Sequence, residues 1–251
     1  MKLLTLNLNF YGAKHGPWVA RRAMIEEILR AERPDVIALQ AVARDPAVDG
    51  GLDQAAQLAR ALPQYAHVVF EAVSRTEEGG GDGSEEGMAF LSRFPILETR
   101  ALGLSRREGH EDPFRRIALR GTFDAPGGAV HVLNAHFSWV EAQALDNLAE
   151  TLPLFEALSG PAALVGDFNQ TPQGEVARRL REAGLTDAWT QVRADLPGFT
   201  FYEGDSLSKR IDYLWLNAAL RSRLRDVRLV ADGPGEVRPS DHAGVLATFD
   251  L

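Results

Sequence analysis

The chain has 251 residues, of which 45% are hydrophobic and 25% are charged, a composition that allows one globular domain to bury a large core. It contains no cysteine, which excludes disulfides and thiolate metal sites, so a bound metal would take oxygen and imidazole ligands, as Mg2+ or Mn2+ does. A formal net charge of -8 argues against a protein that grips many nucleic-acid phosphates at once.

The first residues, MKLLTLNLNF, lack a basic stretch followed by a long apolar run and a small-residue cleavage site. No apolar segment of the sequence is long enough to span a bilayer. We therefore expect a cytoplasmic monomer without a membrane partner, in which residues 1–251 form a single domain.

Short segments rich in β-forming residues recur along the chain and are expected to be strands. They are residues 2–10, 35–42, 67–73, 87–96, 117–123, 129–137, 162–169, 211–217, 227–231 and 243–251. The alternation L-T-L-N-L-N in the first segment is typical of a strand with one buried face, whereas the runs VIAL and ALVG predict strands that are buried on both faces.

Segments with apolar residues at helical spacing lie between some of these strands: Val19–Arg30, Leu52–Ala61, Glu141–Leu158 and Gly174–Ala183. Many strands with few helices favour an α/β protein whose sheets pack on each other with helices outside. The Gly-rich, acidic segment Thr76–Gly87 is expected to be a mobile loop, either a solvated hairpin tip or a substrate contact.

The sequence G-D-F-N ends a buried strand with Asp167 and Asn169, which therefore point to the same side. One side chain can accept a proton while the other donates a hydrogen bond to an anion. Asp and Asn at a strand end are also common turn formers, so both interpretations stay open for this motif alone.

His242 lies in S-D-H, directly before the last strand, and its neighbour Asp241 suits a histidine that does acid/base work near neutral pH. A lone histidine is more often a surface or satisfied core residue. Asp212 begins the apolar run I-D-Y-L-W-L, where a buried carboxylate is costly unless it meets a cation or several donors. We therefore predict a hydrogen bond between Asp212 and His242 at the sheet end.

The sequence N-A-H-F ends another strand with Asn134 and His136 on one side, although a capped polar strand end is an equal alternative for that motif alone. Trp139 follows it and could pack on a substrate, but a place in the core or at a helix start is favoured. Arg115 and Arg116 are candidate phosphate contacts, as is Arg210 farther along the chain, although surface arginines are usually solvated.

In chain order, Asn7, Gln40, Glu86, His136 and the motifs GDFNQTP, RIDY and SDHAGV resemble the endonuclease/exonuclease/phosphatase family, also called the DNase I-like fold. The resemblance covers nearly the whole chain. It implies a four-layer αββα sandwich, in which two mixed sheets pack face to face with helices outside and the active site lies at one end of the sheets.

The resemblance also implies divalent-metal-dependent hydrolysis of a phosphodiester or a phosphomonoester by in-line attack of water. By match of motif, His242 would act at the scissile phosphate and would be oriented by Asp212. Asp167 would orient or deprotonate the attacking water, and Asn169 would stabilise the phosphorane-like transition state. In-line attack accumulates negative charge that imidazolium, amide donors and a divalent ion can offset.

Further phosphate contacts follow from the same match. His136 would hydrogen-bond a phosphate oxygen with the support of Glu86, and Arg116 and Arg210 are the substrate-binding candidates. The expected partner is a phosphoester, either an end of DNA or RNA or a small phosphodiester.

Asn7, Asn9 and Asp241 match positions that surround the family's metal ion, Mg2+ or Mn2+. The family's main ligand is the glutamate of a Q-E pair, but this chain has Gln40–Ala41. Because a methyl group cannot ligate, metal binding is expected to be weakened or absent in this form. Either the protein has drifted toward lower activity or the glutamate was changed deliberately, and the intact remaining positions favour the second. The alternative function, supported by Ala41 alone, is a non-catalytic phosphate- or nucleic-acid-binding member of the same fold.

Overall fold

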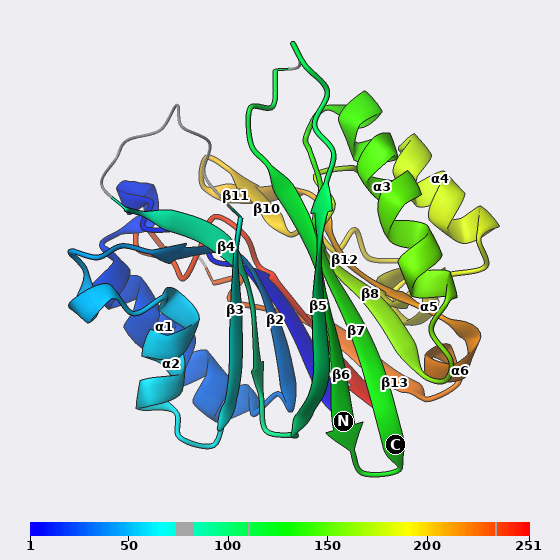
Figure 1. Ribbon diagram of the computed structural model, residues 1–251, viewed down its shortest axis with the longest axis horizontal. Helices are drawn as coiled ribbons and strands as arrows, with labels where there is room; N and C mark the ends of the chain where they lie inside the picture. Colours follow the sequence, from blue (N-terminus) through cyan, green and yellow to red (C-terminus); the bar gives the residue numbers. More distant parts are fainter. Residues whose placement is uncertain (74–82, 110, 234) are drawn as a thin grey trace.

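Two six-stranded mixed sheets form the centre of the protein, and a computed structural model describes residues 1–73, 83–109, 111–233 and 235–251 (Figure 1). The first sheet has the order β13-β14-β1-β2-β4-β3. Its strands are β1 (Lys2–Asn7), β2 (Val36–Arg44), β3 (His67–Val73), β4 (Glu85–Ser92), β13 (Leu224–Val230) and β14 (Gly244–Phe249).

The second sheet has the order β5-β6-β7-β8-β12-β9. Its strands are β5 (Ile96–Leu104), β6 (Arg116–Ala125), β7 (Gly128–His136), β8 (Ala162–Asp167), β9 (Thr186–Asp187) and β12 (Asp212–Leu216). A separate antiparallel pair is formed by β10 (Phe201–Glu203) and β11 (Ser206–Lys209).

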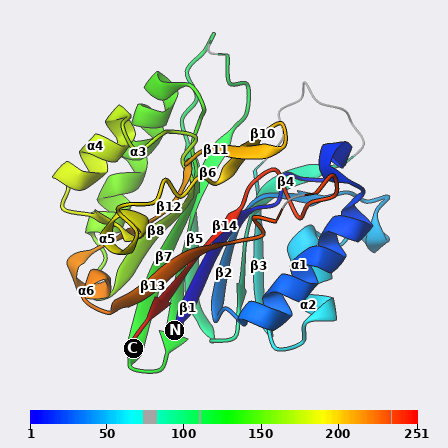
Figure 2. The ribbon, with the colours of Figure 1, turned by 180° about the vertical axis from the view of Figure 1, so that it is seen from behind.

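Helices cover the outer face of each sheet, α1 and α2 on the first sheet and α3 and α4 on the second, as both views show (Figures 1 and 2). Their bounds, with those of the short helices α5 and α6 and of two 3-10 turns, are α1 (Trp18–Glu32), α2 (Gln54–Ala61), α3 (Glu141–Glu156), α4 (Glu175–Glu182), α5 (Ala188–Val192), α6 (Ala218–Arg221), η1 (Ala13–His15) and η2 (Asp49–Gly51). The order helix, sheet, sheet, helix confirms the four-layer αββα sandwich.

Each interface between layers has its own apolar core. Between the sheets, the rings of Phe90 and Phe123 meet edge to face with centroids 5.2 Å apart. Leu4 and Leu29 belong to the core under α1 and α2, and Trp215 belongs to the core under α3 and α4. Because the central strands of both sheets pack on both sides, the loops at the sheet ends are held on a rigid support.

The alternating pattern in β1 was expected to indicate a strand with one buried face, but both faces of β1 are buried. Leu4 and Leu6 face the helices, but the polar face of the strand points to the second sheet and not to solvent. There Gln40 Nε2 donates to Thr5 Oγ1 (2.9 Å) and to Asn134 Oδ1 (2.7 Å), so buried polar groups of both sheets satisfy each other. The prediction of an apolar buried face is confirmed, and the polar face takes part in hydrogen bonds between the two sheets.

Every expected strand and helix has an observed counterpart, and two differences lie within residues 76–96. The segment 87–96 is not one strand, since β4 ends at Ser92 and the edge strand β5 begins at Ile96. The expected loop Thr76–Gly87 falls largely on residues 74–82, outside the described residues, and β4 already begins at Glu85. Across the described ranges, no helix is long and apolar enough to cross a membrane.

Candidate active site

The polar motif residues gather at one end of the sheets. Parallel strands β1 and β2, and likewise β7 and β8, end there, and the antiparallel strands β12 and β14 begin there. These ends surround a cavity of about 160 Å³. Its lining residues are Asn7, Asn9, Phe10, Ala41, Phe114, Arg116, His136, Trp139, Asp167, Asn169, Asp241 and His242.

Gly166 allows β8 to deliver Asp167 to this cavity. Its φ of +131° lies in a region that favours glycine, and a Cβ atom added there would lie 1.9 Å from the carbonyl oxygen of Ala135 in the neighbouring strand. The close approach of the two strands places Asp167 opposite His136 in the parallel register.

The carboxylate of Asp167 is the centre of the polar contacts. Its Oδ2 accepts a hydrogen bond from Asn7 Nδ2 (2.9 Å), and its Oδ1 accepts one from the backbone N–H of Asn169 (2.8 Å). The Nε2 atoms of His136 and His242 lie 3.5 and 3.7 Å from Oδ2. Asp167 therefore forms the local turn and also faces the cavity, so both interpretations of the G-D-F-N motif describe it.

The two buried histidines have opposite pKa shifts because their charged neighbours differ. Burial, with the positive charges of Arg116 and His242, lowers the pKa of His136 well below its usual value. Burial would also lower the pKa of His242, but the carboxylates of Asp212 and Asp167 outweigh it and raise that pKa to about 10. Burial and the charge of Asp212 raise the pKa of Asp167 to about 7. The site thus holds an imidazolium beside a carboxyl that titrates near neutrality.

The predicted contact between His242 and Asp212 is confirmed, with Nδ1 and Oδ2 2.9 Å apart. The Asp212 backbone N–H donates to Thr200 Oγ1 (3.1 Å), and the ring of Phe201 lies against the His242 ring with centroids 5.0 Å apart. The hydrogen bond fixes the orientation of the imidazole and directs its Nε2 atom toward Asp167.

Ala41 lies in the same cavity as the expected metal-side residues, in a bulge of β2 where its φ is +49°. Its carbonyl oxygen accepts a hydrogen bond from the N–H of Phe10 (2.9 Å). Asn7 Oδ1 accepts one from the Asn9 N–H (2.8 Å), and Asp241 adds a carboxylate to the lining. Ala41 therefore lines the cavity together with residues that carry oxygen ligand atoms.

These donors fit a hard divalent ion that keeps much of its water, because Mg2+ is commonly held through one or two carboxylates. Beside them, a buried cluster of Asp167, Asp212 and His242 has ligand-type atoms within 4.8 Å of one another. Two members of that cluster already bond each other, so Asp241 and Asp167 are the better carboxylate candidates.

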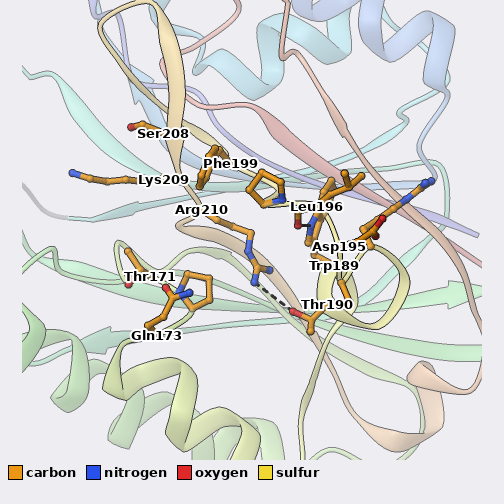
Figure 3. A pocket seen from close by; sticks show the side chains of 14 residues that line it. Thr171, Gln173, Trp189, Thr190, Asp195, Leu196, Phe199, Ser208, Lys209 and Arg210 are labelled. Carbon is orange, nitrogen blue, oxygen red and sulfur yellow. Dashed lines mark hydrogen bonds between the residues drawn. The ribbon is translucent and has the colours of Figure 1, made fainter.

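The arginine candidates separate. Arg116 lines the cavity and is fixed by Asp112, with Nη2 and Oδ2 3.1 Å apart, whereas Arg115 is exposed. Arg210 differs from its expected place, since it lines a second cavity of about 600 Å³ (Figure 3). There its Nη1 atom lies 2.5 Å from Oδ2 of Asp187, a buried carboxylate that requires a cation as its partner. Its Nη2 atom donates a hydrogen bond to Thr190 Oγ1 (3.4 Å).

Trp139 directly precedes Val140, the N-cap residue of α3, as expected for a residue at a helix start, and its side chain is exposed at the cavity rim. Phe114 is exposed at the same rim and was not predicted from the sequence. An apolar residue directly before the pair Arg115–Arg116 in a polar loop was the available signal for Phe114. Glu86 is buried in β4 opposite Ala43 and Val73, and its support of His136 stays a prediction.

A profile of the endonuclease/exonuclease/phosphatase family matches residues 4–242. Exodeoxyribonuclease III of Haemophilus influenzae is 22% identical over 293 residues, which cover 99% of this chain and 100% of that protein. An endonuclease/exonuclease/phosphatase structure from Beutenbergia cavernae is 28% identical with a TM-score of 0.80, over 98% of this chain and 70% of that chain. A mannosyl-6-phosphatase structure from Bacteroides thetaiotaomicron is 20% identical with a TM-score of 0.75, over 100% of both chains. The chain belongs to the endonuclease/exonuclease/phosphatase family of phosphoester hydrolases.

Proposed function

We propose that this protein is a divalent-metal-dependent phosphoesterase that hydrolyses a phosphodiester or a phosphomonoester by in-line attack of water, in a form weakened by Ala41. The observation that carries the proposal is the carboxylate of Asp167, which lies within 4 Å of the Nε2 atoms of two buried histidines at the cavity. Its relatives include proteins named for the cleavage of DNA and of a sugar phosphate, which agrees with a phosphoester substrate.

In this proposal Asp167 receives the proton of the attacking water, because a base whose pKa is raised to about 7 is half deprotonated near neutral pH. His242, kept as an imidazolium by Asp212, places a positive charge and an N–H donor at the phosphate. Asn169 Nδ2 donates one hydrogen to Phe137 O (2.9 Å) and keeps its second for a transition-state oxygen.

His136 would contribute differently because it is neutral. A neutral imidazole can donate one hydrogen bond to a phosphate oxygen without adding charge, while Arg116 supplies the charge from the same wall of the cavity. Asn7, Asn9 and Asp241 would hold a Mg2+ or Mn2+ ion, which leaves Asp167 free to accept the proton. When bound, that ion would offset the negative charge that develops on the phosphate oxygens.

A second function, non-catalytic binding of a phosphate group, is favoured by Ala41 alone. An activity screen separates the two: the parent protein, Ala41→Glu and Ala41→Gln are assayed with Mg2+ and Mn2+ on diesters and monoesters. Turnover that is gained in Ala41→Glu but not in Ala41→Gln supports the hydrolase. No turnover in a folded Ala41→Glu protein with any ester would favour the binding protein.

A further inference from the structure

Two exposed aromatic side chains stand at the rim of the catalytic cavity. Phe114 is 46% exposed and Trp139 is 44% exposed, and both line the cavity that contains His136 and His242. They come from separate loops, one before β6 and one between β7 and α3. Large apolar side chains that gather in the open at a polar cavity commonly mark a binding surface.

The two rings form a fixed corner. Their centroids are 5.7 Å apart and their planes meet at 66°. The guanidinium carbon of Arg116 lies 5.6 Å from the Phe114 centroid and 5.7 Å from the Trp139 centroid, so one buried cation contacts both rings. Because Asp112 holds Arg116 and also accepts a hydrogen bond from the Phe114 N–H (3.0 Å), the corner is in place before any ligand binds.

The position of this corner indicates what it contacts. Arg116 lines the cavity beneath the rings, so a phosphate near His242 would have the group esterified to it beside Phe114 and Trp139. A nucleobase presents a flat π face and a pyranose presents a face of C–H groups, and an aromatic side chain can cover either one, whereas a short aliphatic alcohol offers no such face. An unstacked alcohol would leave both rings in water.

We propose that the corner formed by Phe114 and Trp139 selects phosphoesters whose alcohol carries a ring, a nucleobase or a pyranose, by stacking on that ring. The inference rests on the proposed function, since it takes the phosphate to lie in the same cavity. It assigns Trp139 and Phe114 as specificity-determining residues outside the proton-transfer chemistry.

Binding tests this directly, because the parent protein with Ala41 is expected to turn ligands over slowly. Adenosine 5'-monophosphate, mannose 6-phosphate and glycerol 3-phosphate are titrated calorimetrically into the parent and into Trp139→Ala, Phe114→Ala and Trp139→Phe. One of the ring-bearing esters should bind more tightly than glycerol 3-phosphate. Trp139→Ala should weaken that ester by about 5- to 150-fold, the range found for removing one base-stacking ring, and Trp139→Phe should restore part of it.

Phe199→Ala is the matched control, because Phe199 is also an exposed aromatic residue (37%) but lines the second cavity (Figure 3). It should leave the preference unchanged. A preference for the nucleotide identifies a base as the stacked ring, and a preference for the hexose ester identifies a pyranose. Equal affinity for all three esters, no binding of any, or an equal loss for all three in Trp139→Ala overturns the proposal. Failure of the proposed hydrolysis would instead appear as inactivity of Ala41→Glu, which these titrations do not measure.

Discussion

The Nδ1 atom of His242 lies 2.9 Å from the Oδ2 atom of Asp212, and both side chains are buried. In the Ala41→Glu background, replacing His242 by Ala should lower the rate of hydrolysis by about two to three orders of magnitude, the usual effect of losing a positioned donor to developing negative charge. The rate constant for a generic phosphodiester is the measurement. Activity within a few-fold of that of Ala41→Glu alone would remove His242 from the mechanism.

The same change tests whether the pair acts in folding as well. Removing His242 leaves the Asp212 carboxylate buried without its cation, which should lower the free energy of unfolding by about 3–5 kcal/mol. Adding Asp212→Asn removes the uncompensated charge, so the double variant should recover stability but not turnover. A double variant as unstable as His242→Ala would show that the stability loss arises from packing and not from charge.

His136 and His242 should differ in protonation at pH 7, His136 neutral and His242 an imidazolium. Side-chain 15N chemical shifts followed over pH distinguish the two forms. Because the pKa of His136 is lowered, the unfolded chain takes up a proton below about pH 6.5 that the folded chain refuses, so this group makes stability fall as pH drops below that value. The raised pKa of His242 acts in reverse, and its contribution is lost as pH rises toward about 10. Both rings titrating together near pH 6.5 would contradict this.

Arg116 and Arg210 should differ in their effect on substrate binding. Each variant leaves a buried aspartate without its partner, Asp187 in Arg210→Ala and Asp112 in Arg116→Ala, so each should cost about 3–5 kcal/mol of stability. Arg116→Ala alone should also raise KM by about tenfold or more, the effect of losing one hydrogen bond to a charged group. Denaturant unfolding and steady-state kinetics in the Ala41→Glu background make the comparison. An equal rise of KM in both variants would return Arg210 to the substrate site.

The sequence predicted a contact best where the local pattern around one residue required a partner that another motif could supply. Asp212 opens an apolar strand, so its carboxylate required a donor, and a histidine preceding the last strand could supply it. In contrast, Arg116 and Arg210 both precede strands in polar surroundings, and nothing near Arg210 in the sequence points to Asp187, 23 residues away. Only the packing of β9 against β12 brings those two together.

The contact between Phe114 and Trp139 at the rim of the cavity could not be predicted for a similar reason. Phe114 and Trp139 belong to different loops, and their contact depends on the register of β6 and β7, which a single sequence does not give. The edge strand β5 escaped detection because most of its side chains are exposed, so it lacks the hydrophobic alternation of a half-buried strand. Local chemistry was therefore easier to predict than the surfaces formed between loops.

We expect Ala41 to limit the metal affinity of this protein. Its backbone already has the left-handed φ of +49° with a Cβ atom present, so a longer side chain adds no new backbone strain. Ala41 lines the cavity together with Asn7 and Asp241, where a glutamate could place a carboxylate. Ala41→Glu should tighten Mg2+ or Mn2+ binding by at least about 10–100-fold, since loss of a mere outer-sphere partner costs that much, and turnover should rise with it.

Calorimetric titration of the metal, together with diester turnover, is the measurement for Ala41→Glu. Ala41→Gln is the control of equal length and no charge. Equal metal affinity and equal turnover in the parent and in Ala41→Glu would show that position 41 does not contact the metal, and the match of Gln40–Ala41 to the family's Q-E pair would then be wrong.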